Sequence, residues 1–140
     1  MRLVLDTNVV LTAMRSRAGA SAELLRRIRL RRARMLASVP LFIEYEAVLT
    51  RPEHREAANL SQAEVETIID ALAALVEPVE TFFLWRPQLR DEKDEMVLEA
   101  AINGRAEALV TYNERDFAPA AARFGLRLAR PPHILERLRV

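Results

Sequence analysis

Four acidic side chains spread along the chain have the type and the placement to do chemistry: Asp6, Glu44, Asp94 and Asp116. Carboxylate oxygens are the ligands that hard divalent cations prefer, and the chain has no cysteine to offer a softer thiolate. A divalent ion held by carboxylates can activate water and stabilise charge on a phosphate. Metal-assisted hydrolysis of a phosphodiester is therefore the first chemistry that these residues suggest.

Two of these acids follow predicted strands. Asp6 comes directly after the apolar run Leu3-Val4-Leu5, and Asp116 follows a second run that ends at Thr111. In open α/β sheets, ligands bind beyond the carboxyl ends of the strands, where both acids would lie. Each acid also has an ordinary explanation, because Asp6 could form an Asx-turn and Asp116 could cap a helix before Ala118.

The other two acids lie in predicted helices. Glu44 and Asp94 each fall in line with an apolar stripe, formed by Leu41, Tyr45, Val48 and Leu49 in the first helix and by Val97, Leu98 and Ala101 in the second. Both side chains would therefore point with the core face of their helix, and spacing favours Asp94 over its acidic neighbours as the one facing in. Glu44 could instead pair with an arginine, and Asp91 and Asp94 could simply cap their helix.

The joint placement of the acids says more than any one of them. Helices that follow strands of a parallel sheet begin at its carboxyl edge, so all four carboxylates can converge there. Like charges in one pocket repel each other, and a bound cation removes that repulsion.

The elements that must position these acids are short apolar strands that alternate with amphipathic helices. The expected strands are 2–5, 35–39, 79–84, 108–111 and 124–129. The expected helices are 22–32, 41–50, 53–58, 62–76, 92–103 and 132–139. This order predicts an α/β fold in which a central, mostly parallel sheet of about four or five strands has helices on both faces.

Length and composition fit one domain over residues 1–140, and we expect a cytoplasmic protein with no membrane span. The net charge is only +1, but arginines are dense near the N-terminus. A basic patch beside an acidic site suits a polyanionic substrate. An arginine-rich helix face in solvent, or one that binds an acidic protein, explains the same pattern equally well.

The chain resembles the PIN-domain family of small metal-dependent ribonucleases over essentially its full length. Within that family it is most similar to VapC-type toxins of bacterial toxin–antitoxin systems and to a related putative toxin group. The resemblance rests on Val4-Leu5-Asp6-Thr7-Asn8, on Glu44-Tyr45 with Val48-Leu49-Thr50-Arg51-Pro52, on Asp91-Glu92-Lys93-Asp94, and on Thr111-Tyr112-Asn113 with Arg115-Asp116-Phe117. The last segment matches the Thr-x-Asn-x-x-Asp-Phe form of VapC-type relatives rather than the Thr-Gly-Asp form of the other group.

The resemblance implies a Rossmann-like PIN fold and a function as an endoribonuclease that hydrolyses RNA. It implies that Asp6, Glu44, Asp94 and Asp116 hold one or two Mg²⁺ or Mn²⁺ ions, directly or through water. It further implies a cognate antitoxin as partner and allows a homodimer. Residues that would support the ligands or bind phosphate are Thr7, Asn8, Asp91, Thr111 and Asn113. Residues that would bind the RNA backbone are Arg15, Arg17, Arg26 and Arg27.

Two rival interpretations remain. A phosphatase of the haloacid dehalogenase type needs a second Asp two residues after the first, where this chain has Asn8, and a receiver domain needs a late lysine, whereas Lys93 is the sole lysine. The second rival is a PIN-fold module that binds RNA or protein without cleaving anything. Metal binding without cleavage would identify it.

Overall fold

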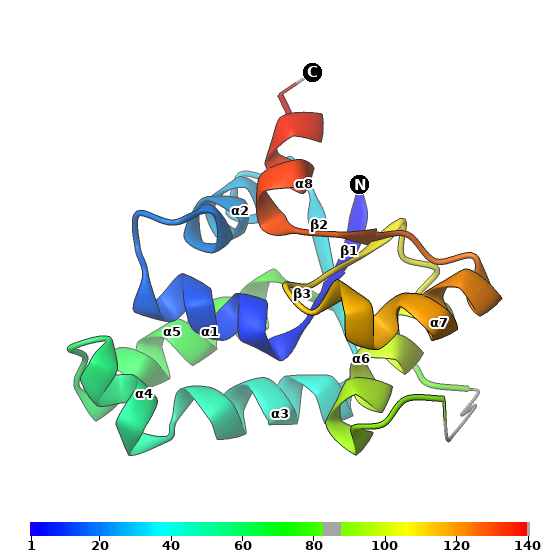
Figure 1. The fold of residues 1–140 in the computed structure, drawn as a ribbon. Coiled ribbons are helices and arrows are strands. Elements are labelled where there is room, and N and C mark those ends of the chain that lie inside the picture. The colour runs from blue at the N-terminus through cyan, green and yellow to red at the C-terminus, as the bar shows by residue number, and fades with distance from the viewer. Residues whose placement is uncertain (83–87, 140) are drawn as a thin grey trace.

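The computed structural model describes residues 1–82 and 88–139 of the chain. Five strands in these residues form one sheet in which every neighbouring pair is parallel (Figure 1). In the order β3-β2-β1-β4-β5 they are Val76–Pro78, Arg34–Ala37, Arg2–Leu5, Ala108–Val110 and Leu128–Ala129. The predicted α/β class with a parallel sheet is confirmed.

Helices pack on both faces of this sheet. They are α1 (Thr7–Arg15), α2 (Ala20–Arg29), α3 (Val39–Leu49), α4 (Pro52–Ala57), α5 (Gln62–Leu75), α6 (Glu92–Asn103), α7 (Glu114–Phe124) and α8 (Pro131–Arg137). α1 contacts α2 and α3, and α2 contacts α8, whereas α6 packs on β1, β2, β4 and α7 (Figure 1). The helices divide between the two faces because the chain first moves from β1 to β3 and then continues at β4 on the other side of β1. Right-handed connections made in these two directions place their helices on opposite faces of the sheet.

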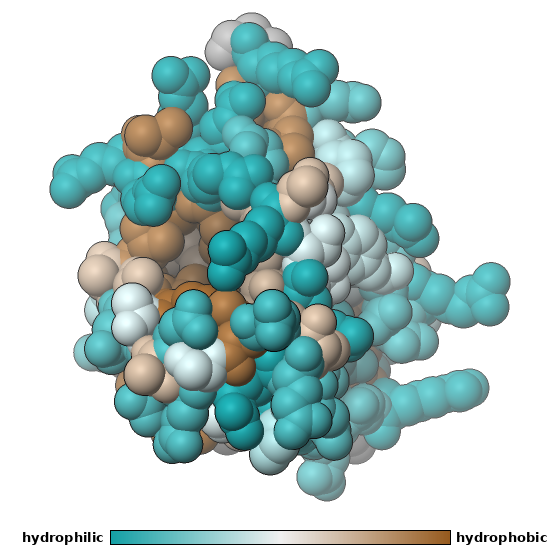
Figure 2. Space-filling view, turned by 90° about the vertical axis from the view of Figure 1, so that its left-hand side faces the viewer, coloured by the Kyte–Doolittle hydropathy of each residue, from teal (hydrophilic) through white to brown (hydrophobic). Residues whose placement is uncertain are grey.

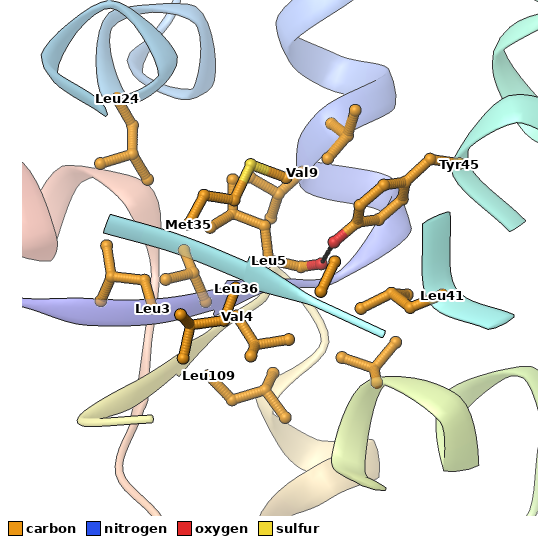
Figure 3. Close-up of a cluster of buried hydrophobic side chains, with 14 of the residues drawn as sticks. Leu3, Val4, Leu5, Val9, Leu24, Met35, Leu36, Leu41, Tyr45 and Leu109 are labelled. Atoms are coloured by element: carbon orange, nitrogen blue, oxygen red, sulfur yellow. Dashed lines mark hydrogen bonds between the residues drawn. The ribbon is translucent and has the colours of Figure 1, made fainter. Parts of the chain in front are cut away.

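The centre of the core is β1, whose apolar residues are inaccessible to solvent. Leu3, Val4 and Leu5 each have 0% exposure, because β2 and β4 flank this strand, α6 packs on it, and buried side chains of α1 belong to the same apolar cluster. Figure 3 shows these side chains among those of β2, β4 and the first helices. A fully apolar strand is what burial on both faces requires, and it explains why the run before Asp6 has no polar member.

Two helices, α1 and α7, were not predicted from the sequence. α1 follows Asp6 without a loop and buries Val9, Val10, Ala13 and Met14. α7 begins at Glu114 and contains Pro119, a residue that usually breaks helices. It ends at Gly125, whose φ of 65° closes the helix in the left-handed conformation that glycine adopts without strain.

The strands at the two edges also differ from expectation. β3 occupies Val76–Pro78, directly after α5, instead of residues 79–84. The end of that expected strand, residues 83 and 84, lies outside the described residues. β5 is confined to Leu128–Ala129, because α7 continues to Phe124 in the span expected to be strand.

Hydrophilic side chains cover much of the face formed by α1, α2, α4 and α5, with apolar groups gathered between them (Figure 2). On this side, α2 and α5 border an apolar groove that includes Leu25, Ile68 and Leu72 and carries Arg26 and Arg29 at its margin. None of the helices in residues 1–82 and 88–139 is both long and apolar enough to cross a membrane.

Candidate functional site

The site lies where β1 and β4 run side by side and the chain switches direction across the sheet. Leu5 pairs with Val110 in the parallel register, and the Asp6 N–H donates to the Val110 carbonyl at 2.9 Å. Asp6 and Thr111 are therefore the first residues beyond two adjacent strand ends. Their side chains meet, since Thr111 Oγ1 donates to Asp6 Oδ2 at 2.8 Å. This is the position at which α/β sheets bind ligands.

Asp6 is a buried carboxylate with 3% exposure. Burial raises its pKa above the ordinary value, and the negative charge of Asp116 raises the pKa further. The Thr111 hydroxyl and the nearby main-chain N–H groups of Thr7 and Asn8 lower the pKa in opposition. These donors explain how a carboxylate persists at the buried end of an apolar strand.

Tyr45 fixes the helix that carries Glu44. Its side chain is fully buried, and its hydroxyl donates to the main-chain carbonyl of Leu5, the residue directly before Asp6 (Figure 3). α3 is thereby held against the end of β1, and half-buried Glu44 lies at the edge of the core facing Asp6 across a shared hollow. No ion pair involving Glu44 occurs among the described residues, so the arginine pair that would have explained it is absent there.

The start of α6 brings two more acids to this edge. Asp91 is the N-cap and accepts a hydrogen bond from the Lys93 N–H at 3.0 Å, whereas Asp94 lies in the first turn with its side chain half-buried. Burial raises the pKa of Asp94, and the charges of Asp6, Asp91, Asp116 and Glu95 raise it further, to about 7. Asp94 is thus a carboxyl group on which burial and the negative charges of its neighbours act together to favour the protonated form.

Asp116 lies in the first turn of α7 and is exposed. The helix begins after Asn113, so the alternative in which Asp116 itself caps a helix before Ala118 is wrong. The Asn113 N–H donates to Thr111 Oγ1 at 2.9 Å, which connects the start of α7 to the Asp6–Thr111 pair. Buried Phe117 anchors the same turn in the core.

Two hollows meet at Asp91 and Asp94. The Asp6 hollow, of about 230 Å³, is lined by Asp6, Thr7, Asn8, Leu11, Glu44, Val48, Arg51, His54, Asp91, Lys93 and Asp94. The Arg115 hollow, of about 530 Å³, is lined by Gln88, Leu89, Arg90, Asp91, Asp94, Arg115, Asp116 and Pro119. Three of the four predicted acids, Asp6, Glu44 and Asp94, line the Asp6 hollow. Asp116 lines the Arg115 hollow instead, and its negative charge raises the pKa of both Asp6 and Asp94.

The acid of α6 that is most deeply buried is Glu95 rather than Asp94. It has 2% exposure, and its Oε1 accepts the main-chain N–H groups of Gln88 and Leu89 at 2.6 and 2.8 Å. Glu95 therefore holds the segment that leads into Asp91. Periodicity alone favoured Asp94 as the inward side chain, because the sequence does not reveal that main-chain donors lie across from Glu95.

The basic residues that line the site lie in segments that the sequence did not single out for RNA binding. Arg51 and Lys93 line the Asp6 hollow together with the imidazole of His54, and Arg90 and Arg115 line the Arg115 hollow. Their nearest signal in the sequence is adjacency to the acidic motifs, as in Arg90-Asp91 and Arg115-Asp116.

The four arginines predicted to bind the RNA backbone line neither hollow. Arg26 and Arg27 pair with Glu23 at 2.8 and 2.9 Å on α2. Arg15 ends α1 and Arg17 follows it, and both are exposed. The structure thus separates this basic cluster from the acids, and its role in RNA binding stays a prediction.

The donor set of the site fits a hard divalent cation. All the acids that share the edge offer carboxylate oxygens. Burial, and then the charges of the other acids, raise the pKa of Asp6 and Asp94, and a bound cation would lower both pKa values. In the part of the chain that the structure describes, no three His, Cys, Asp or Glu side chains are yet arranged to hold a metal ion. The carboxylates are gathered by charge and by a common hollow rather than in coordination geometry.

Comparisons with known proteins agree with this fold. Residues 2–115 match the family model of the PIN domain. Two similar solved structures are described as VapBC2 from Rickettsia felis bound to a DNA fragment from their promoter and as VapBC-1 from nontypeable Haemophilus influenzae. The first has 16% identity and a TM-score of 0.66, covering 93% of this chain and 98% of that chain. The second has 18% identity and a TM-score of 0.61, covering 94% and 99%.

A comparison with curated proteins finds no match. The match to the family model spans most of the chain, from the start of β1 to the second residue of α7. It includes every segment that borders the site except the rest of α7, with Asp116 and Pro119. The chain belongs to the PIN domain family.

Proposed function

We propose that this protein is a metal-dependent endoribonuclease and the toxin of a toxin–antitoxin pair. The observation that carries the proposal is the convergence of Asp6, Asp94 and Asp116, whose charges act on one another at the switch point of the sheet. Glu44 joins Asp6 and Asp94 in the Asp6 hollow. Such an arrangement suits Mg²⁺ or Mn²⁺.

The four acids would hold the ion or ions, which when bound would activate water and stabilise charge on the phosphate. The remaining tasks fall to the chain itself. Thr111 orients Asp6 through its 2.8 Å hydrogen bond, and Tyr45 fixes the end of β1 beneath it. Asp94 can hold a proton near neutral pH, as its pKa of about 7 indicates, until a cation displaces that proton.

An antitoxin partner is supported by the fold comparison, since both similar structures are described as VapBC assemblies. The exposed apolar groove between α2 and α5, with Arg26 and Arg29 at its margin, offers a surface on which a partner can bury apolar groups and place acidic ones.

The proposal is tested by incubating the purified protein with total RNA and Mn²⁺ or Mg²⁺. We expect cleavage that EDTA abolishes and that Asp94→Asn reduces by at least 100-fold. Asp70→Asn is the matched control, because Asp70 is exposed on α5 and lines neither hollow. This control should cleave as the wild type does.

Calorimetry with Mn²⁺ separates the ways in which the assay can fail. Binding without cleavage would contradict the ribonuclease and favour a module that binds RNA or protein. Absence of both binding and cleavage would indicate that the acids have structural roles only.

A further inference from the structure

The larger of the two hollows adjoins the acids but contains features that metal binding does not explain. The Arg115 hollow shares Asp91 and Asp94 with the Asp6 hollow, so a strand whose phosphate reaches Asp94 lies next to both hollows. Its volume of about 530 Å³ lies in the range of small-ligand sites.

The side chains of the two arginines that line this hollow are available to bind a ligand. In residues 1–82 and 88–139, the side chains of Arg90 and Arg115 form no ion pair and no hydrogen bond, although each is the direct neighbour of an acid, Asp91 and Asp116. By contrast, Arg26 donates to Glu23. Exposed guanidinium groups without a protein partner are well suited to bind phosphate oxygens through paired N–H donors.

Two apolar residues also line this hollow. Leu89 is half-buried against the core, and exposed Pro119 belongs to α7. The main chain at Gln88 and Leu89 is fixed by Glu95, with hydrogen bonds of 2.6 and 2.8 Å. Sugar and base rings pack against apolar surfaces of this kind.

Gln88 adds a directional polar group at the rim. Its side-chain Oε1 accepts a hydrogen bond from Arg123, which orients the amide. Within residues 1–82 and 88–139 its Nε2 group makes no hydrogen bond, so its two hydrogens can be donated to a ligand. Such a donor favours bases that present an acceptor on their edge.

We propose that the Arg115 hollow binds the nucleotide next to the cleaved phosphodiester, with Arg90 and Arg115 on its phosphate and Leu89 and Pro119 against its base. This inference rests on the proposed ribonuclease function and deepens it. Gln88 contacts the base edge in this arrangement and sets a base preference beside the cut. The hollow favours single-stranded RNA, because an unpaired base leaves its stack to enter a pocket at a lower energetic cost than a paired one.

Binding of a fluorescent pool of random single-stranded RNA in EDTA tests the phosphate contacts without turnover. Arg90→Ala and Arg115→Ala should each bind roughly tenfold more weakly at low salt. Each should also lower the slope of log affinity against log salt by about 0.7. Arg127→Ala is the matched control, because exposed Arg127 precedes β5 at the opposite, amino edge of the sheet.

The base contact is tested by sequencing the ends that Gln88→Ala and the wild type generate from total RNA. We expect the wild type to favour particular bases beside the cut and Gln88→Ala to lose that preference while still cutting. An unchanged base distribution overturns the base contact, and unchanged affinity and slope in both arginine variants overturn the phosphate contact. In either case a wild type that binds and cuts RNA keeps the proposed function, whereas a wild type that does neither overturns both.

Discussion

The hydroxyl of Thr111 donates to the carboxylate of Asp6 across the junction of β4 and β1, at 2.8 Å and with both side chains buried. The two residues are far apart in the sequence and are joined because Leu5 and Val110 are partners in the parallel ladder. The hydrogen bond lowers the pKa of Asp6, in opposition to burial, which raises it. Thr111 therefore helps to keep Asp6 ionised and ready to bind a cation.

Replacing Thr111 by valine, which keeps the shape but loses the hydroxyl, should raise the pKa of Asp6 further. A metal ion would then compete with a proton over a wider pH range, and we expect Mn²⁺ affinity at pH 6 to fall roughly tenfold or more. The loss should shrink at pH 8.5, where the proton competes less. Isothermal titration at both pH values measures it, with Thr111→Ser as the control that keeps the donor. An equal loss at both pH values would contradict this role.

Tyr45→Phe should destabilise the protein by about 1–3 kcal/mol, because it leaves the buried carbonyl of Leu5 without its donor. Urea denaturation measures the change. Tyr112→Phe, which removes a less buried hydroxyl bonded to Ser21 at 2.6 Å, should cost less. If α3 is positioned by this bond, Tyr45→Phe should also weaken Mn²⁺ binding, whereas Tyr112→Phe should not. A loss of stability with unchanged metal affinity would show that Tyr45 supports the core alone.

The pKa of Asp94 predicts how stability depends on pH without metal. A carboxyl group whose pKa is about 7 in the folded protein keeps its proton after the unfolded chain, with its ordinary value of 3.8, has released it. Stability should therefore fall as the pH rises between these values, and Asp94→Asn should remove that part of the decline. Asp94 is half-exposed, so solvent screening limits the expected gain to the order of 1 kcal/mol at pH 8.

Thermal denaturation in EDTA at pH 5 and pH 8 checks this expectation. A change of about 1 kcal/mol in the free energy of unfolding should shift Tm by roughly 2–4 °C. Asp94→Asn should melt above the wild type at pH 8 and close to it at pH 5. Addition of Mn²⁺ should raise the Tm of the wild type and not that of the variant. A variant that melts below the wild type at both pH values would show that Asp94 stabilises the fold in its charged form.

Two substitutions of Glu95 test how much its hydrogen bonds to the loop before α6 contribute to the free energy of unfolding. Glu95→Ala should remove the acceptor for the Gln88 and Leu89 N–H groups and cost about 2–3 kcal/mol. Glu95→Gln keeps one carbonyl oxygen for both donors, and its loss should be smaller. Chemical denaturation ranks the two, and equal losses would indicate that the charge of Glu95 matters more than its acceptor.

The sequence was sufficient to predict an element wherever the local pattern of residues determines its conformation. The apolar run 2–5 predicted β1, and the Ser61–Glu64 capping box, which the structure contains in full, predicted the start of α5. The parallel sheet followed from the alternation of strands and helices, and the four acids were recognisable by their places beside those elements.

What the sequence could not show depends on contacts between distant segments. α7 forms despite Pro119 because Phe117, Ala120 and Ala121 bury one of its faces, which outweighs the local preference against proline. Glu95 is buried because main-chain donors from the preceding loop lie opposite it. The arginines of α2 are a different case, because Glu23 precedes Arg26 and Arg27 by three and four residues, a spacing that by itself favours ion pairs within one helix.

The strand order also bears on the timing of activity during synthesis. β1 lies beside β4 in the finished sheet, so the edge at Asp6 has no neighbour on that side until Ala108–Val110 has left the ribosome. Thr111 and Asp116 emerge later still. A nascent chain therefore carries its first acid before the other acids of the site have been synthesised. For a protein proposed to cut RNA, this topology delays assembly of the site until β4 and the start of α7 have left the ribosome.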